Sequence, residues 1–196
     1  MKSLAFLAAL ALVAVASASK YQVQLREIRV PEGTTTKGLC CDALFAGSCD
    51  CFFCWLNSVH CDLYINVCLE TIDKGDDDPK NCEGGFVSTG LLEENADSYV
   101  FANNERYNAF NNPHVWDDIE DDATQLRIKI QVYDEDYHFF GLNPDDEVFS
   151  WSSRLTPGAE LKAGTPYELY ANAMRPGGLS PISLSYTLMR LEDEEK

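Results

Sequence analysis

The sequence predicts an all-β fold, a two-sheet antiparallel β-sandwich. Three observations support this prediction: segments in which polar and apolar residues alternate, turn-forming residues between those segments, and no convincing long-helix pattern. The chain of 196 residues is 45% hydrophobic and 11% aromatic, which is enough to bury one core. A disordered acidic chain would be poor in both kinds of residue.

Three segments alternate most regularly, and they predict the strongest strands. They are residues 21–28, 62–69 and 125–132. Alternation at every second position places the apolar side chains on one face of a strand. Each of the three is therefore predicted to bury one face.

Shorter segments raise the expected number of strands to about eight. They cover residues 85–91, 99–102, 147–155, 167–175 and 183–191. Turn-forming residues separate the strands, at residues 31–33, 74–76, 111–113, 141–144, 157–158 and 176–178. This arrangement favours an eight-stranded antiparallel sandwich, with a disulfide-rich N-terminal segment.

The amino terminus has the pattern of a secretory signal peptide. Lys2 is followed by an apolar run at residues 4–15 and by Ala16-Ser17-Ala18, a small-x-small cleavage site. We expect a signal peptide at residues 1–18, one domain at residues 19–191 and an acidic tail at residues 192–196. No second apolar stretch of membrane length follows, so the expected product is secreted and extracellular, without a transmembrane segment.

The chain carries 15 Lys and Arg against 32 Asp and Glu, a formal net charge of −17. This charge argues against nucleic acid as a partner, and against anionic lipid bound through bulk attraction, because both favour a basic surface. It suits calcium, a cationic partner or simple solubility.

Eight cysteines lie between residues 40 and 82, and none follows. In an oxidising compartment this pattern predicts a disulfide framework. Zinc is disfavoured because its cysteine ligands would have to stay reduced, and a thioredoxin-type site is disfavoured because no helix is predicted beside the Cys-x-x-Cys pair. The connectivity stays open, except that Cys61 and Cys68 would lie about 20 Å apart on one extended segment, too far to pair. The eight are Cys40, Cys41, Cys49, Cys51, Cys54, Cys61, Cys68 and Cys82.

The spacing of these cysteines resembles that of a known family. A Cys40-Cys41 doublet, a strand from Cys61 to Cys68-Leu69, and Cys82 followed by glycines resemble the N-terminal, C2-like domain (MNNL) of the Notch ligands Delta, Serrate and Jagged. A late strand that ends in Tyr133-Asp134 extends the likeness. The resemblance implies a C2-type eight-stranded sandwich, here with an extra disulfide. The family's receptor-binding module and EGF repeats are not found, so we expect a stand-alone secreted module.

The resemblance to C2 domains also implies a calcium site. C2 calcium loops carry a strand, an Asp-x-Asp pair and a further Asp, and calcium takes about 6–8 oxygen ligands. The corresponding residues are Asp134, Asp136, Asp145 and Asp146. The alternative is an acidic loop that is merely solvated. Two further acidic runs, at residues 117–122 and 76–78, are expected to be solvated loops.

Apolar residues follow the Asp-x-Asp pair, at the tip of the predicted loop. Exposed aromatic side chains there would suit contact with a membrane or a protein partner. Buried, they would instead cap the end of the sandwich, and both interpretations stay open. The residues are Tyr137, Phe139, Phe140 and Leu142.

No catalytic motif is found, and the three histidines are not at ligand spacing, so the chain is expected not to be an enzyme. The leading hypothesis is a secreted, non-enzymatic binding module that recognises a cell-surface protein or phospholipid, with calcium, and modulates Notch-type signalling. The alternative is an acidic, disulfide-stabilised extracellular protein with a structural or calcium-buffering role.

Overall fold

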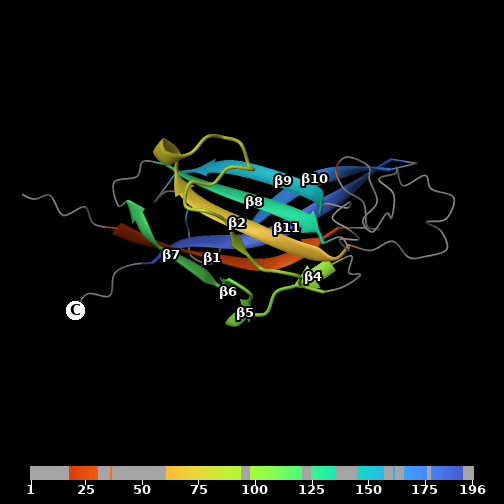
Figure 1. Ribbon diagram of the computed structural model, residues 1–196, viewed down its shortest axis with the longest axis horizontal. Coiled ribbons are helices and arrows are strands. Elements are labelled where there is room, and N and C mark those ends of the chain that lie inside the picture. Colours follow the sequence, from red (N-terminus) through yellow and green to blue (C-terminus); the bar gives the residue numbers. More distant parts are fainter. Residues whose placement is uncertain are drawn as a thin grey trace, which may run out of the picture.

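The computed structural model describes residues 18–30, 36, 61–93, 98–120, 125–135, 145–156, 161, 166–175 and 178–191. These residues form a two-layer sandwich of antiparallel strands (Figure 1). Within these ranges the only helical element is a 3₁₀ turn, η2 (Ile72–Lys74). The predicted all-β sandwich is confirmed.

The first sheet is built around β1. Its order is β10-β11-β1-β4, and β7 also pairs with β1. β11 lies along one edge of β1, whereas β7 and β4 share the other edge. The strands are β1 (Ala18–Arg29), β4 (Ser98–Val100), β7 (His114–Glu120), β10 (Pro166–Arg175) and β11 (Gly178–Leu191).

The second sheet has the order β3-β2-β8-β9. β2 and β8 pair along their whole lengths, from Leu63 opposite Asp134 to Thr71 opposite Leu126. The strands are β2 (Leu63–Thr71), β3 (Val87–Ser88), β8 (Leu126–Asp134) and β9 (Asp146–Leu155).

The facing surfaces of the two sheets form one hydrophobic core. Along most of each long strand every second residue points inward, as the alternation predicts, and the pattern shifts by one residue at irregularities in β1 and β9. Fully buried examples from the two sheets are Val23, Leu25, Ile65, Val67, Ile128, Ile130, Leu184 and Leu188.

Three strands were not expected from the sequence: β5 (Glu105–Tyr107), β6 (Phe110–Asn112) and β7. The expected turn at residues 111–113 overlaps β6, and the expected solvated run at residues 117–122 begins inside β7. Asn and Asp disfavour strands locally, but in β7 pairing with β1 and burial of Ile119 outweigh that preference. β5 and β6 pair with each other as a separate two-stranded sheet.

Asn112 shows how the split edge of β1 is completed. β7 pairs with β1 up to Val23, and β4 begins at Glu27, which leaves Leu25 between them. The side chain of Asn112, 1% exposed, accepts a hydrogen bond from the Leu25 N–H at 2.9 Å and donates one to the Leu25 carbonyl at 3.0 Å. An asparagine therefore takes the place of a neighbouring strand.

β8 differs from its predicted pattern. The sequence predicts one buried face, but the structure buries both, and the polar face carries Arg127, 2% exposed, and Lys129, 0% exposed. Residues that follow β2 cover this face, and their contacts with the two cations are described below. The prediction was wrong because alternation shows which face of a strand is apolar. It does not show whether a later loop covers the polar face.

Candidate functional site

The register of β8 and β9 gathers acidic residues at one end of the second sheet. Asp134 is the last residue of β8 and pairs with Asp146, the first residue of β9; Asp145 precedes it. Three of the four predicted calcium ligands therefore share one end of a strand pair, although the side chain of Asp146 is not described. Asp136 lies outside the described residues.

Asp134 and Asp145 each hold neighbouring structure in place. Asp134 is fully buried, and its Oδ1 accepts a hydrogen bond from the Asp62 N–H at 2.6 Å. The Tyr64 hydroxyl donates to Oδ2 of Asp145 at 2.8 Å, and burial together with this bond raises the pKa of Tyr64. Because a carboxylate has about four lone-pair sites, such bonds are compatible with metal binding.

Among the described residues, one group of three potential ligands lies within 4.8 Å: Cys68, Glu70 and Cys82. It cannot bind a metal through thiolates, because Cys68 and Cys82 form a disulfide. Calcium binding by the acidic end of β8 and β9 therefore stays a prediction.

The predicted loop tip and most predicted disulfide residues lie outside the described residues. The loop-tip residues are Tyr137, Phe139, Phe140 and Leu142, and the cysteines are Cys40, Cys41, Cys49, Cys51 and Cys54. The three described cysteines are all disulfide-bonded. Since Cys68 bonds to Cys82, it is not the partner of Cys61.

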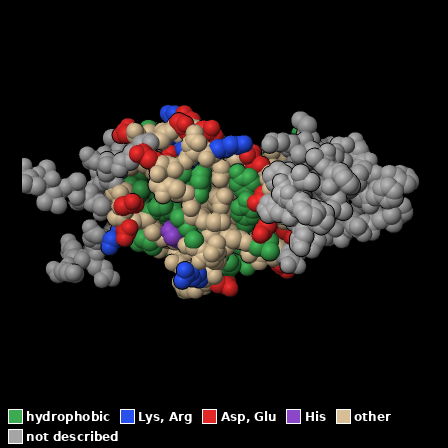
Figure 2. Space-filling model, viewed as in Figure 1, with side chains coloured by type: hydrophobic (Ala, Val, Ile, Leu, Met, Phe, Trp, Pro, Cys, Tyr) green, Lys and Arg blue, Asp and Glu red, His purple; other side chains and the backbone are tan. Residues whose placement is uncertain are grey.

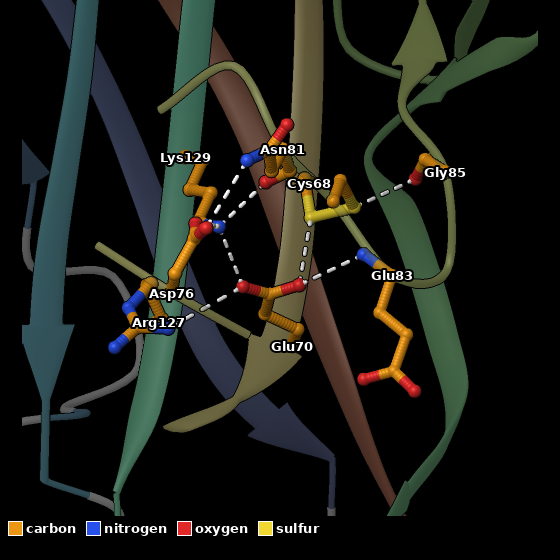
Figure 3. Close-up of a disulfide and its surroundings, with 9 residues drawn as sticks. Cys68, Glu70, Asp76, Asn81, Glu83, Gly85, Arg127 and Lys129 are labelled. Atoms are coloured by element: carbon orange, nitrogen blue, oxygen red, sulfur yellow. Dashed lines mark hydrogen bonds and ion pairs between the residues drawn. A yellow bond between two sulfur atoms is a disulfide. The ribbon is translucent and has the colours of Figure 1, made fainter. Parts of the chain in front are cut away.

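A buried charge cluster lies beside the disulfide (Figure 3). Glu70 of β2, 5% exposed, lies opposite Arg127 of β8. Its Oε1 lies 2.8 Å from Lys129 Nζ and 3.6 Å from Arg127 Nη1. Its Oε2 accepts a hydrogen bond from the Glu83 N–H at 3.1 Å. One carboxylate thus meets two buried cations and the chain just after Cys82.

The segment between β2 and β3 supplies the other partners of these cations. Arg127 donates to the Gly75 carbonyl and to Asp77, and Lys129 donates to the Asn81 carbonyl. Asp77 also binds Arg154 of β9, and that hydrogen bond lowers the pKa of Asp77. We call residues 72–86 the cover loop, because they lie over the outer face of the sheet.

The cover loop adds a contact that the sequence did not predict. Residues 76–78 are exposed, as expected of a solvated run, and Asp76 and Asp77 also form ion pairs with the buried cations. Sequence reasoning also missed Glu70, Arg127 and Lys129. The sequence did contain a signal for this cluster. Basic residues lie on the polar face of one predicted strand, and an acidic run lies between two cysteines, one of which belongs to another predicted strand.

A family model described as the N terminus of Notch ligand C2-like domain (MNNL) matches residues 18–116, half of the chain. The chain belongs to this family. No curated protein matches the chain. Within the described residues, no helix is long and apolar enough to cross a membrane.

Two solved structures share the fold. The structure of Drosophila C2-DSL-EGF1 has 16% identity and a TM-score of 0.54, over 90% of this chain and 68% of that one. A C2 domain protein from Ramazzottius varieornatus has 12% identity and a TM-score of 0.51, over 90% of this chain and 91% of that one. Family membership and fold support a binding module.

We expect the charge cluster to be strongly coupled. Glu70→Leu removes the carboxylate that pairs with both buried cations. The free energy of unfolding should therefore fall by about 3–5 kcal/mol. Glu70→Leu combined with Lys129→Met should cost less than the sum of the two single changes, because the pair is removed together. Urea unfolding of the oxidised protein measures this; additive losses would contradict a coupled cluster.

Proposed function

We propose that this chain is an extracellular, non-enzymatic recognition module, which uses calcium at the acidic end of β8 and β9 to contact phospholipid head groups at a cell surface. One observation carries the proposal: strand pairing places Asp134 opposite Asp146, directly beside Asp145. Family membership supports a role near Notch-type signalling.

The geometry suits a cation site made by two strand ends. Calcium needs several oxygen ligands that converge, and adjacent strands are about 4.8 Å apart. The backbones of Asp134 and Asp146 are paired at that spacing, and Asp136 lies between these two residues in the sequence. The hydrogen bonds of Asp134 and Asp145 preorganise two of the carboxylates.

Calcium also resolves a conflict of charge. A chain with a net charge of −17 repels an anionic surface, whereas a bound divalent cation offsets part of the local negative charge and can bridge carboxylates to phosphate. The signal-peptide pattern and the cysteine-rich segment support an extracellular location. Sites with dissociation constants of about 10⁻⁴–10⁻³ M are typical of extracellular calcium modules.

Replacing Asp134 and Asp136 by Asn should remove most of the calcium affinity, because two formal charges are lost. The amide introduced by Asp134→Asn would still offer an oxygen to the Asp62 N–H, so the local structure should survive. Isothermal calorimetry on the unmodified protein should show saturable binding, and the double variant should show little. The matched control is Asp73→Asn with Asp117→Asn, which removes two exposed carboxylates elsewhere. If calcium binding does not saturate and is equal in the double variant and the control, the result contradicts a defined site and favours bulk calcium buffering.

Replacing Phe139 and Phe140 by Ser tests the loop tip. If these rings contact a membrane, binding to phosphatidylserine vesicles with calcium should be lost while the melting temperature stays nearly unchanged. Rings that cap the core would instead cost about 3–5 kcal/mol each, as large-to-small core changes do. Vesicle sedimentation and thermal unfolding of the same variant separate the outcomes; a large loss of stability would contradict the membrane-contact role.

A further inference from the structure

A second recognition site lies at the opposite end of β2 from the acidic residues. A pocket of about 240 Å³ opens between β2 and β7. Thr71 and Leu63 mark the two ends of β2, so this pocket is about 26 Å from the Asp134 end. It is lined by Leu69, Glu70, Thr71, Glu83, Gly84, Gly85, Trp116, Asp118 and Ile119.

We propose that this pocket binds the basic side chain of a protein partner, a lysine or arginine whose charged end meets Glu83, Asp118 and the Thr71 hydroxyl while its stem lies against Trp116. The site is distinct from the calcium site, and the proposal does not depend on calcium or lipid. Its volume is below the range of about 300–1,000 Å³ found for drug-sized ligands, which fits a single side chain.

The charge of the lining favours a cation. Three of its residues are acidic and none is basic. Lys129 and Arg127 neutralise Glu70 from the outer face of the sheet. Glu83 and Asp118 are exposed, and neither forms an ion pair with a cation in the described part of the chain. Two carboxylates thus remain available at the rim.

A buried hydroxyl supplies an independent reason for a polar ligand. Thr71 is 4% exposed, and within the described residues its Oγ1 has no hydrogen-bond partner. A buried polar atom without a partner is uncommon, because it costs free energy relative to water. A hydroxyl oxygen accepts a hydrogen bond from an ammonium or guanidinium group, so a basic side chain would satisfy it.

Trp116 offers an aromatic surface that is already held in position. Its ring lies 4.5 Å from His114 and 6.5 Å from Phe110, between centroids, in edge-on contacts. A cation over the face of Trp gains favourable energy, and an alkyl stem packs on the same face. Figure 2 shows hydrophobic side chains reaching the surface on this side of the molecule, with acidic side chains around them.

The glycine turn keeps one side of the pocket open. Gly85 has a φ of +81°, which favours glycine, and a Cβ added to Gly84 would meet nothing within 4 Å. In Figure 3 the Glu83 N–H points to Glu70, whereas its carboxylate extends away from the disulfide. The arrangement does not suit a metal ion, because in the described ranges no three carboxylates converge within 4.8 Å.

The test is a titration of ¹⁵N-labelled protein with acetyl-Gly-Lys-Gly-amide in EDTA, followed by the indole N–H signal of Trp116, which Trp116→Phe assigns. We expect a saturable shift with the lysine peptide and none with the norleucine analogue. Glu83→Gln and Asp118→Asn should each weaken binding about threefold, as expected for exposed ion pairs. Equal binding of both peptides, or no shift at Trp116, would overturn the proposal.

Two variants make the result specific. Asp117→Asn removes the same charge from the neighbouring residue of β7, which is not part of the pocket lining, and should leave binding unchanged. Thr71→Val should raise the melting temperature, because it removes a buried hydroxyl without a partner, and weaken the lysine peptide about tenfold. A loss as large with Asp117→Asn, or unchanged binding with Thr71→Val, would contradict the proposed site.

Discussion

The structure depends on the burial of two cations, Arg127 and Lys129, against one carboxylate, Glu70. Buried charges are costly unless they are paired and hydrogen-bonded, so the chain must supply partners above the sheet as well as within it. The cover loop does this through Gly75, Asp77 and Asn81. The Cys68–Cys82 disulfide then ties the end of the loop to the strand that it covers.

The same cluster positions the pocket at the edge of the sandwich. Glu70 accepts a hydrogen bond from the Glu83 N–H, so the anion that neutralises the buried cations also sets the course of the Glu83–Gly85 turn. Two acidic regions thus lie at opposite ends of β2. Near Asp134 the carboxylates come from the ends of two strands, and near Thr71 they come from a turn and from β7. A chain that is acidic overall thus gathers carboxylates at both ends of β2.

Periodicity predicted much of this fold. The eight expected segments each overlap a strand, because alternation directly reports which residues face the core. β7 escaped prediction because its Asp residues belong to an acidic run, and pairing with β1 makes it a strand. β5 and β6 are three residues each and pair with one another, so neither has a pattern long enough to predict a strand. The role of Asn112 in completing the edge of β1 follows from the fold and has no local signature.

The site was predictable in part for a similar reason. Strand order brings Asp134 and Asp146 together, whereas their role as calcium ligands stays a prediction. The pocket was not foreseen, because its lining comes from β2, the turn after Cys82 and β7, which are far apart in sequence. Asp118 looked like part of a solvated run, and the structure distinguishes it from Asp117 because only Asp118 lines the pocket.

The central claim is that the cover loop seals Lys129 inside a folded domain, and amine acetylation tests it most directly. Treating the native, oxidised protein with an acetylating reagent, followed by peptide mass spectrometry, should modify Lys80, whose side chain is 57% exposed, and leave Lys129 unmodified. Lys129 should react only after the protein is unfolded in urea. Acetylation of Lys129 in the native protein at the rate of Lys80 would contradict the account.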